Sequence, residues 1–145
     1  RALELDPFYD WTYALLGDYY MRFVAGDTTI SAEQRQQAML QAAENYQQAL
    51  AYADLGSSLR YNYFIALAGA QAETGQVGLA IANYLQALQI STAPSENWRI
   101  EEVVARLYFQ SGDRAKALAY AQSALAGAPE DQKPNIQALI LELGG

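Results

Sequence analysis

The chain has 145 residues, and its 16 acidic and 9 basic side chains give a net charge of −7 at neutral pH. Such an acidic surface repels phosphate backbones and anionic lipids, so a nucleic-acid ligand is not expected. The sequence contains neither cysteine nor histidine, which excludes disulfides, thiol nucleophiles, the commonest zinc ligands and the usual general base. Because no apolar run approaches ~20 residues, direct membrane insertion of this segment is not expected either.

The chain opens with Ala2–Pro7, a stretch that has the form of the end of a helical repeat. Residues 1–9 are therefore predicted to be the tail of a preceding repeat. Because the sequence begins inside a repeat and lacks an initial Met, we expect it to be a piece of a longer protein.

A first helical hairpin is predicted over residues 10–55, with an insertion between its two helices. Gly17 and Ala42 are 25 positions apart, whereas the equivalent Ala68 and Ala80 of the next hairpin are only 12 apart. Ser31 and Gln34 form the pattern of a capping box, and residues 32–53 contain no Gly or Pro. The second helix should therefore run about two turns longer than its counterparts, and the first should extend to about residue 25. The long hairpin is interpreted either as a tolerated insertion or as a docking protrusion.

Two more hairpins are predicted over residues 61–94 and 98–131. Their turn glycines, Gly75 and Gly112, are 37 positions apart in nearly superimposable surroundings, which indicates a stack of repeated hairpins. Residues 132–145 are predicted to form a capping helix with four apolar side chains on one side: Ile136, Leu139, Ile140 and Leu143.

The shared pattern places a Leu and a small residue on each first helix, a Gly at the turn, and an Ala, a bulky residue and a second Ala on each second helix. This resembles the tetratricopeptide repeat (TPR) family and its W-x2-L-G-x2-Y…A-x3-F-x2-A…P signature. The resemblance implies an all-α fold: a right-handed α-solenoid of antiparallel helical hairpins, with about three repeats and a capping helix in one domain, residues 1–145. Three departures, which should loosen local packing, are Gln71, Glu101 and Ala121.

The pattern also predicts which large side chains are buried. The tyrosines at framework positions are expected in the core: Tyr13, Tyr20, Tyr46, Tyr84 and Tyr108. Trp98 is expected to pack on a neighbouring hairpin rather than on a partner.

The resemblance further implies that the first helix of every repeat lines a concave groove that binds extended peptides. The groove residues predicted on this basis are Trp11, Asp18, Met21, Arg22, Asn62, Ile65, Arg99, Glu102, Arg106 and Phe109. The alternative is that these residues form an ordinary solvated face and contacts between repeats. Binding of acidic chaperone tails is not expected, because Ala14 and Asp18 occupy positions where that subtype carries Lys and Asn.

No catalytic constellation, metal-ligand spacing or cofactor motif is present in the sequence, so we do not expect an enzyme. The leading interpretation is a protein-protein interaction scaffold whose partner is a protein or a peptide. The alternative is a structural spacer or self-association module that forms a homo-oligomer. The composition is also similar to bacterial repeat domains that lie outside the membrane in O-antigen ligase-like or polymerase-like proteins. The sequence is compatible with a location in the cytoplasm and with one in the periplasm or outside the cell.

Overall fold

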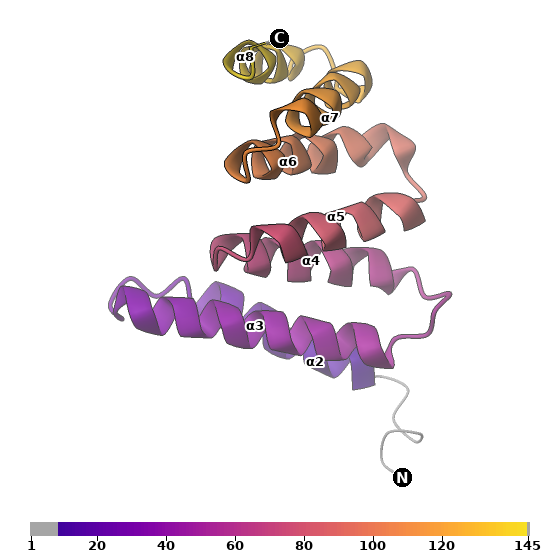
Figure 1. Ribbon diagram of the computed structural model, residues 1–145. Helices are drawn as coiled ribbons and strands as arrows, with labels where there is room; N and C mark the ends of the chain where they lie inside the picture. The colour runs from indigo at the N-terminus through magenta and orange to yellow at the C-terminus, as the bar shows by residue number, and fades with distance from the viewer. Residues whose placement is uncertain (1–8, 145) are drawn as a thin grey trace. The chain divides into compact units, whose positions relative to one another are not determined.

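The computed structural model describes residues 9–144, which form seven α-helices, one π-helical segment and one 3₁₀ turn, with no strand among them (Figure 1). The predicted all-α class is therefore confirmed for this part of the chain. Residues 1–8, and with them most of the predicted tail of a preceding repeat, lie outside the described residues. The elements are α2 (Tyr9–Tyr19), η1 (Tyr20–Val24), α3 (Ala32–Tyr52), α4 (Leu59–Glu73), α5 (Val77–Ile90), η2 (Pro94–Glu96), α6 (Asn97–Gln110), α7 (Arg114–Gly127) and α8 (Lys133–Glu142).

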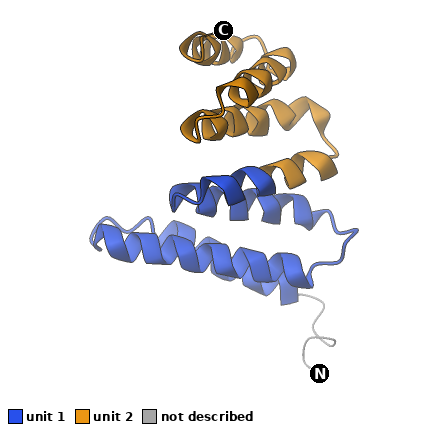
Figure 2. Ribbon diagram, viewed as in Figure 1, with its two compact units in different colours: residues 1–83 blue, residues 84–145 orange. Residues whose placement is uncertain are grey.

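The chain divides into two compact units (Figure 2). The first unit ends at Asn83 and the second begins at Tyr84, so the boundary falls inside α5. The first unit contains α2, η1, α3, α4 and the beginning of α5. The second contains the end of α5 and all later helices.

In the first unit, α2, η1 and α4 all pack against α3. A small residue makes the α2–α3 approach possible. A Cβ atom on Gly17 would lie 2.5 Å from Cε1 of Tyr46, so only glycine fits at this position. The Tyr46 hydroxyl donates a hydrogen bond of 2.7 Å to Asp18, which ties the same two helices together.

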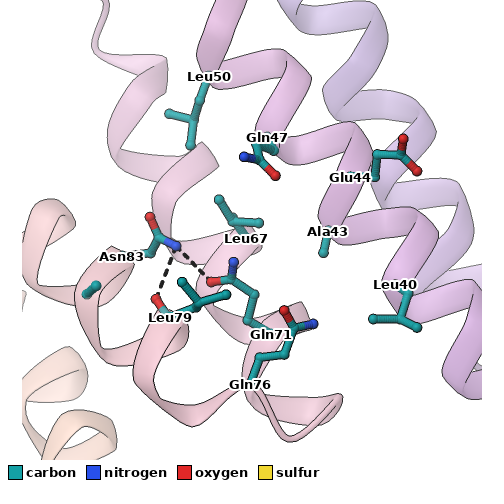
Figure 3. A pocket seen from close by; sticks show the side chains of 11 residues that line it. Leu40, Ala43, Glu44, Gln47, Leu50, Leu67, Gln71, Gln76, Leu79 and Asn83 are labelled. Atoms are coloured by element: carbon teal, nitrogen blue, oxygen red, sulfur yellow. Dashed lines mark hydrogen bonds between the residues drawn. The ribbon is translucent and has the colours of Figure 1, made fainter.

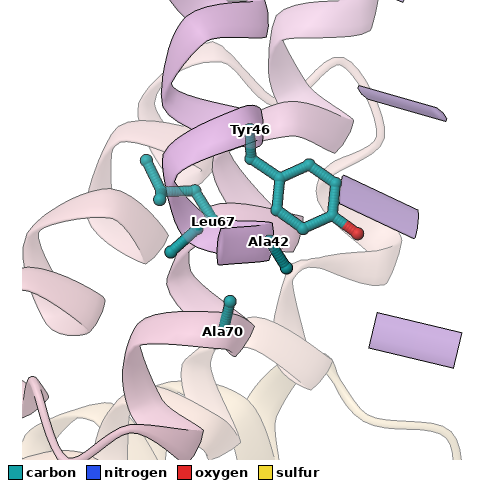
Figure 4. Close-up of a cluster of buried hydrophobic side chains, with 5 residues drawn as sticks. Ala42, Tyr46, Leu67 and Ala70 are labelled. Carbon is teal, nitrogen blue, oxygen red and sulfur yellow. The ribbon is translucent and has the colours of Figure 1, made fainter. Parts of the chain in front are cut away.

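The core of the first unit is built largely from alanines. Ala42 and Tyr46 of α3 meet Leu67 and Ala70 of α4 in one buried cluster (Figure 4). A second cluster joins α2, α3 and α4 through Tyr63, whose hydroxyl donates to Asp10 at 3.1 Å. Small side chains on facing helices let the helix axes come close, while the two tyrosine rings fill the remaining space.

The long hairpin has the predicted form. α3 contains 21 residues whereas α5 and α7 contain 14 each, a difference of about two turns. The Ser31 Oγ accepts from the Gln34 backbone at 3.1 Å, and the Gln34 side chain accepts from the Ser31 backbone at 2.9 Å, so the predicted capping box is present. The first helix of the hairpin continues to Val24 as π-helix, close to the expected end.

In the second unit, α6 and α7 form a hairpin, and α8 packs on α7. Trp98 is buried with Ala124 and Ala128 at the end of α7, the other helix of its own hairpin, and with Ile136 of α8, rather than on a neighbouring hairpin as predicted. The Arg114 Nε atom donates to the Leu143 carbonyl at 2.8 Å and so satisfies a backbone group at the end of α8.

Two turns of the chain repeat the same hydrogen-bond pattern. Gly75 and Gly112 have φ values of 79° and 87°, the left-handed conformation that ends helices. After Gly75, the Gln76 amide donates to the Gln71 carbonyl at 2.8 Å. After Gly112, the next amide donates to the Tyr108 carbonyl at 2.9 Å. The predicted equivalence of the two glycines therefore holds at the level of the backbone.

Some framework residues do not have the burial that the repeat pattern predicts. Leu16, the framework leucine of the first predicted hairpin, is 43% exposed. On α4 the buried aromatic residue is Tyr63, whereas Phe64, which occupies the large first position of the repeat pattern, is half-buried. Of the five framework tyrosines, Tyr46 and Tyr84 are buried. The other three are half-buried: Tyr13, Tyr20 and Tyr108.

Candidate functional site

The predicted groove residues of the first unit have different environments. Asp18 accepts the Tyr46 hydroxyl, and Met21 packs against the cluster that contains Tyr46. Both side chains therefore have structural contacts within the unit. The remaining four are exposed or half-buried: Trp11, Arg22, Asn62 and Ile65.

The predicted groove residues of the second unit lie on one face of α6. Arg106 pairs with Glu102 at 2.8 Å, one turn away. Arg99 pairs with Glu96 at 3.2 Å and lies over the Trp98 ring at 5.2 Å. Exposed pairs of this kind contribute only ~0.3–0.5 kcal/mol, so they would not prevent either guanidinium from exchanging its partner. Phe109 is exposed on the same face.

A groove that the sequence did not indicate lies in the first unit, among α3, α4 and the first turns of α5 (Figure 3). Its volume is about 550 Å³. α3 forms one wall and α5 the other, while α4 forms the floor. The lining residues are Leu40, Ala43, Glu44, Gln47, Leu50, Leu67, Gln71, Gln76, Leu79, Ala82 and Asn83.

Two amides are joined at the floor of this groove. Gln71 is only 7% exposed, and its Oε1 accepts from the Asn83 Nδ2 at 2.7 Å. The same Nδ2 donates to the Leu79 carbonyl at 3.1 Å. These bonds fix the orientation of both side chains. Gln71 occupies the position where the repeat pattern has an aromatic residue, and instead of loosening the packing it forms part of a buried polar pair.

The outer atoms of the pair remain available. Within the described residues, Nε2 of Gln71 and Oδ1 of Asn83 make no hydrogen bond. Figure 3 shows both atoms directed away from the Gln71–Asn83 bond and toward the part of the groove beside Leu50 and Leu67. The amide pair therefore presents one donor, on Gln71, and one acceptor, on Asn83.

Apolar side chains stand beside these amides. Leu40 on the α3 wall is 43% exposed, and Leu79 on the α5 wall is 54% exposed. Glu44 is the only charged side chain among the lining residues, and its carboxylate accepts from Gln41 at 3.2 Å. The groove thus combines exposed leucines, a preoriented amide pair and one negative charge.

A second hollow, of about 360 Å³, lies at the far end of the long hairpin. Tyr20 and Val24 come from η1, and the rest of the lining comes from Ile30 and the first turns of α3. Its polar residues are glutamines on an exposed helix surface, without a buried polar group, so it offers fewer fixed contacts than the groove.

An apolar stripe follows the exposed side of α2 and η1. Trp11, Leu15, Tyr19 and Phe23 recur at every fourth position, and all four are exposed. The last of them lies in the π-helical segment, with its ring 5.9 Å from that of Tyr19. The wider π turn brings Phe23 back into line with the preceding residues, which an α-helix would rotate progressively away.

The two tyrosine–aspartate bonds of the first unit carry its strongest electrostatic perturbations. Burial, followed by the hydrogen bond to Asp18, raises the pKa of Tyr46 well above its usual value. Burial and the bond to Asp10 raise the pKa of Tyr63 to about 12. Both hydroxyls therefore stay protonated at neutral pH and act as structural donors.

No family model matches the chain, and no curated protein matches it. Among residues 9–144, no helix has the length and apolar character needed to cross a membrane. The same residues contain no group of three or more acidic side chains placed to hold a metal ion.

Proposed function

We propose that the chain is a non-catalytic protein-interaction module, of the tetratricopeptide repeat type, that holds a segment of a partner polypeptide in the groove of its first unit. The observation that carries the proposal is the juxtaposition of exposed leucines with the oriented Gln71–Asn83 pair. A monomeric protein gains no stability from exposed leucines, and a partner that covers them gains about 25 cal/mol per Å² buried.

The repeated hairpins support the same function. Stacked helical hairpins present long, fixed surfaces on which side chains of several helices are held at constant spacing, as binding requires. The equivalent turns at Gly75 and Gly112, together with the alanine-rich contacts, are features of such stacks.

The rival location is the face of the first helices that the sequence analysis predicted, to which Asn62 and Arg22 belong. Three substitutions that introduce the same side chain separate the two. Ala82→Arg places a long side chain in the groove, Asn62→Arg alters the rival face, and Ala51→Arg is a matched control on α3. All three positions are exposed, so the fold should tolerate each change.

The experiment selects binders from a displayed library of random short peptides against the whole chain and measures their affinities by fluorescence polarisation. We expect Ala82→Arg to weaken binding at least tenfold, with Ala51→Arg and Asn62→Arg close to the original. Loss of binding in Asn62→Arg alone would move the function to the rival face. A failure to select any peptide whose binding depends on Ala82 would refute the groove as a docking site.

A second candidate function is self-association, which the apolar stripe of α2 and η1 favours. Trp11, Leu15, Tyr19 and Phe23 together expose more apolar surface than scattered single residues do. Sedimentation velocity over a wide concentration range tests this function. A dimer that dissociates on Tyr19→Lys substitution would support it, and a monomer at the highest concentration would exclude it.

A further inference from the structure

We infer that the groove recognises the backbone of an extended peptide, with one residue of the peptide bonded to Gln71 and Asn83. This inference rests on the proposed function, because it specifies what kind of segment the groove takes. It concerns α3, α4 and the start of α5, not the helix face predicted from the sequence.

The first step concerns the hydrogen-bonding groups. In an extended chain the N–H and C=O of one residue point to the same side, as they do when two antiparallel strands exchange a pair of bonds. The groove offers the complementary pair, a donor on Gln71 Nε2 and an acceptor on Asn83 Oδ1. A helical segment has no equivalent free groups in its interior, since its own backbone bonds use them.

The second step concerns burial. Gln71 is more than nine-tenths buried, and its Oε1 is held by Asn83. Its Nε2 has no protein partner among the described residues and still reaches solvent, so a bound carbonyl can replace that solvent as the acceptor. Because the bond to Asn83 already fixes the amide plane, little rotamer entropy is lost when a ligand binds.

The third step concerns the side chains of the ligand. Successive side chains of an extended segment point to opposite faces, so the side chain of the bonded residue reaches one wall and those of its two neighbours reach the other. One wall presents Leu40 and Leu50 with Glu44, and the other presents Leu79. The sequence between residues 9 and 83 carries seven acidic and three basic side chains, which adds to the attraction of a cation at Glu44. The ligand is therefore an extended segment with apolar side chains and a lysine or arginine.

The test uses a selected peptide whose binding Ala82→Arg abolishes. Each backbone amide of the peptide is N-methylated in turn, and each modified peptide is measured against the original chain and against Gln71→Met. We expect one position at which methylation weakens binding about tenfold, corresponding to the loss of one hydrogen bond with a buried partner. In Gln71→Met the original peptide should bind about tenfold more weakly, because the bond to its carbonyl is lost. In Asn83→Leu, which lacks the acceptor of the peptide N–H, methylation at that position should have little further effect.

Gln76→Met is the matched control. Gln76 lines the same groove, but its Nε2 already donates to the Thr74 hydroxyl at 2.9 Å. This variant should retain the affinity and the methylation profile of the original. Circular dichroism and the melting temperature verify that Gln71→Met and Gln76→Met are folded. Glu44→Gln should weaken the binding of a lysine-containing peptide and reduce the dependence of its affinity on salt.

The possible failures are distinct. Suppose that Ala82→Arg abolishes the binding of a peptide, but that the peptide has no amide sensitive to methylation and binds Gln71→Met normally. This result would overturn backbone recognition and leave the proposed function intact. A selected peptide that is helical when bound, by circular dichroism, would overturn it in the same way. If every selected peptide bound Ala82→Arg as tightly as the original chain, both backbone recognition and the proposed function would be overturned.

Discussion

The contact between Gly17 and the Tyr46 ring gives the sharpest test of the packing in the first unit. A Cβ on residue 17 would lie 2.5, 2.7 and 2.8 Å from three atoms of that ring, well inside any normal contact. The ring cannot easily move, because Tyr46 is buried and its hydroxyl is bonded to Asp18. Gly17→Ala should therefore force α2 and α3 apart or displace the ring.

The expected magnitude combines three contributions. Overpacking in a closely packed core costs about 1–3 kcal/mol. Loss of the hydrogen bond between Tyr46 and Asp18 adds about 1 kcal/mol. The higher helix propensity of alanine offsets up to about 1 kcal/mol. The free energy of unfolding of Gly17→Ala should thus fall by about 2 kcal/mol.

Urea denaturation followed by circular dichroism measures this change, and Gly78→Ala is the control. Gly78 lies in the first turn of α5, and no atom lies within 4 Å of the position its Cβ would occupy. The control should therefore be stabilised by roughly 0.5 kcal/mol through propensity alone. If Gly17→Ala gained stability as the control does, the close approach of α2 and α3 would be wrong. In a Tyr46→Leu background the same substitution should be much less destabilising.

Three further predictions concern pH, a helix cap and the second core. Because the folded state raises the pKa of Tyr63 to about 12 from an ordinary value of 10.0, stability should fall as pH rises above 10. Tyr63→Phe should reduce that alkaline loss, measured by urea titration at several pH values. The Asp113 carboxylate accepts from the Lys116 backbone, which lowers its pKa below 3.8, so its contribution should disappear as pH falls through that region. Asp113→Asn should keep the cap and remove this acid dependence, whereas Asp113→Ala should lower the melting temperature at neutral pH. Ile136→Ala, in a fully buried side chain, should cost about 2–5 kcal/mol, whereas Leu141→Ala, on the exposed side of α8, should change stability by less than about 0.5 kcal/mol.

Much of the helical framework could be predicted from local pattern. Ser31 and Gln34 marked the start of the long helix because a capping box depends on residues three positions apart. Gly75 and Gly112 marked helix ends because the left-handed conformation favours glycine whatever surrounds it. These signals are local in sequence, so no knowledge of tertiary packing was needed to interpret them.

Burial was harder to predict, because it depends on which neighbour covers a given face. Leu16 and Leu67 occupy equivalent positions in the repeat pattern, yet Leu67 is buried and Leu16 is exposed. The difference is that Leu67 lies in the buried cluster between α3 and α4, whereas Leu16 on α2 keeps 43% of its surface exposed. A periodic pattern assigns both residues the same environment and therefore cannot predict this difference in burial.

The groove was missed for a related reason, and Gln71 shows what signal it left. A polar residue at an apolar framework position was interpreted as a local defect, since transfer of an unpaired amide into a core is unfavourable. That same cost implies that a buried amide has a partner, and Asn83 lies twelve positions later, on the next helix. The departure at Gln71, together with an amide on the next helix of the hairpin, is therefore the sequence trace of a polar site inside an otherwise apolar repeat. Comparable amides at the two equivalent positions of a hairpin are a general criterion for locating such sites in other helical repeats, and Gln71→Leu with Asn83→Leu tests it here. If the pair were only structural, the double variant would keep peptide affinity, whereas a recognition role predicts folded protein that no longer binds.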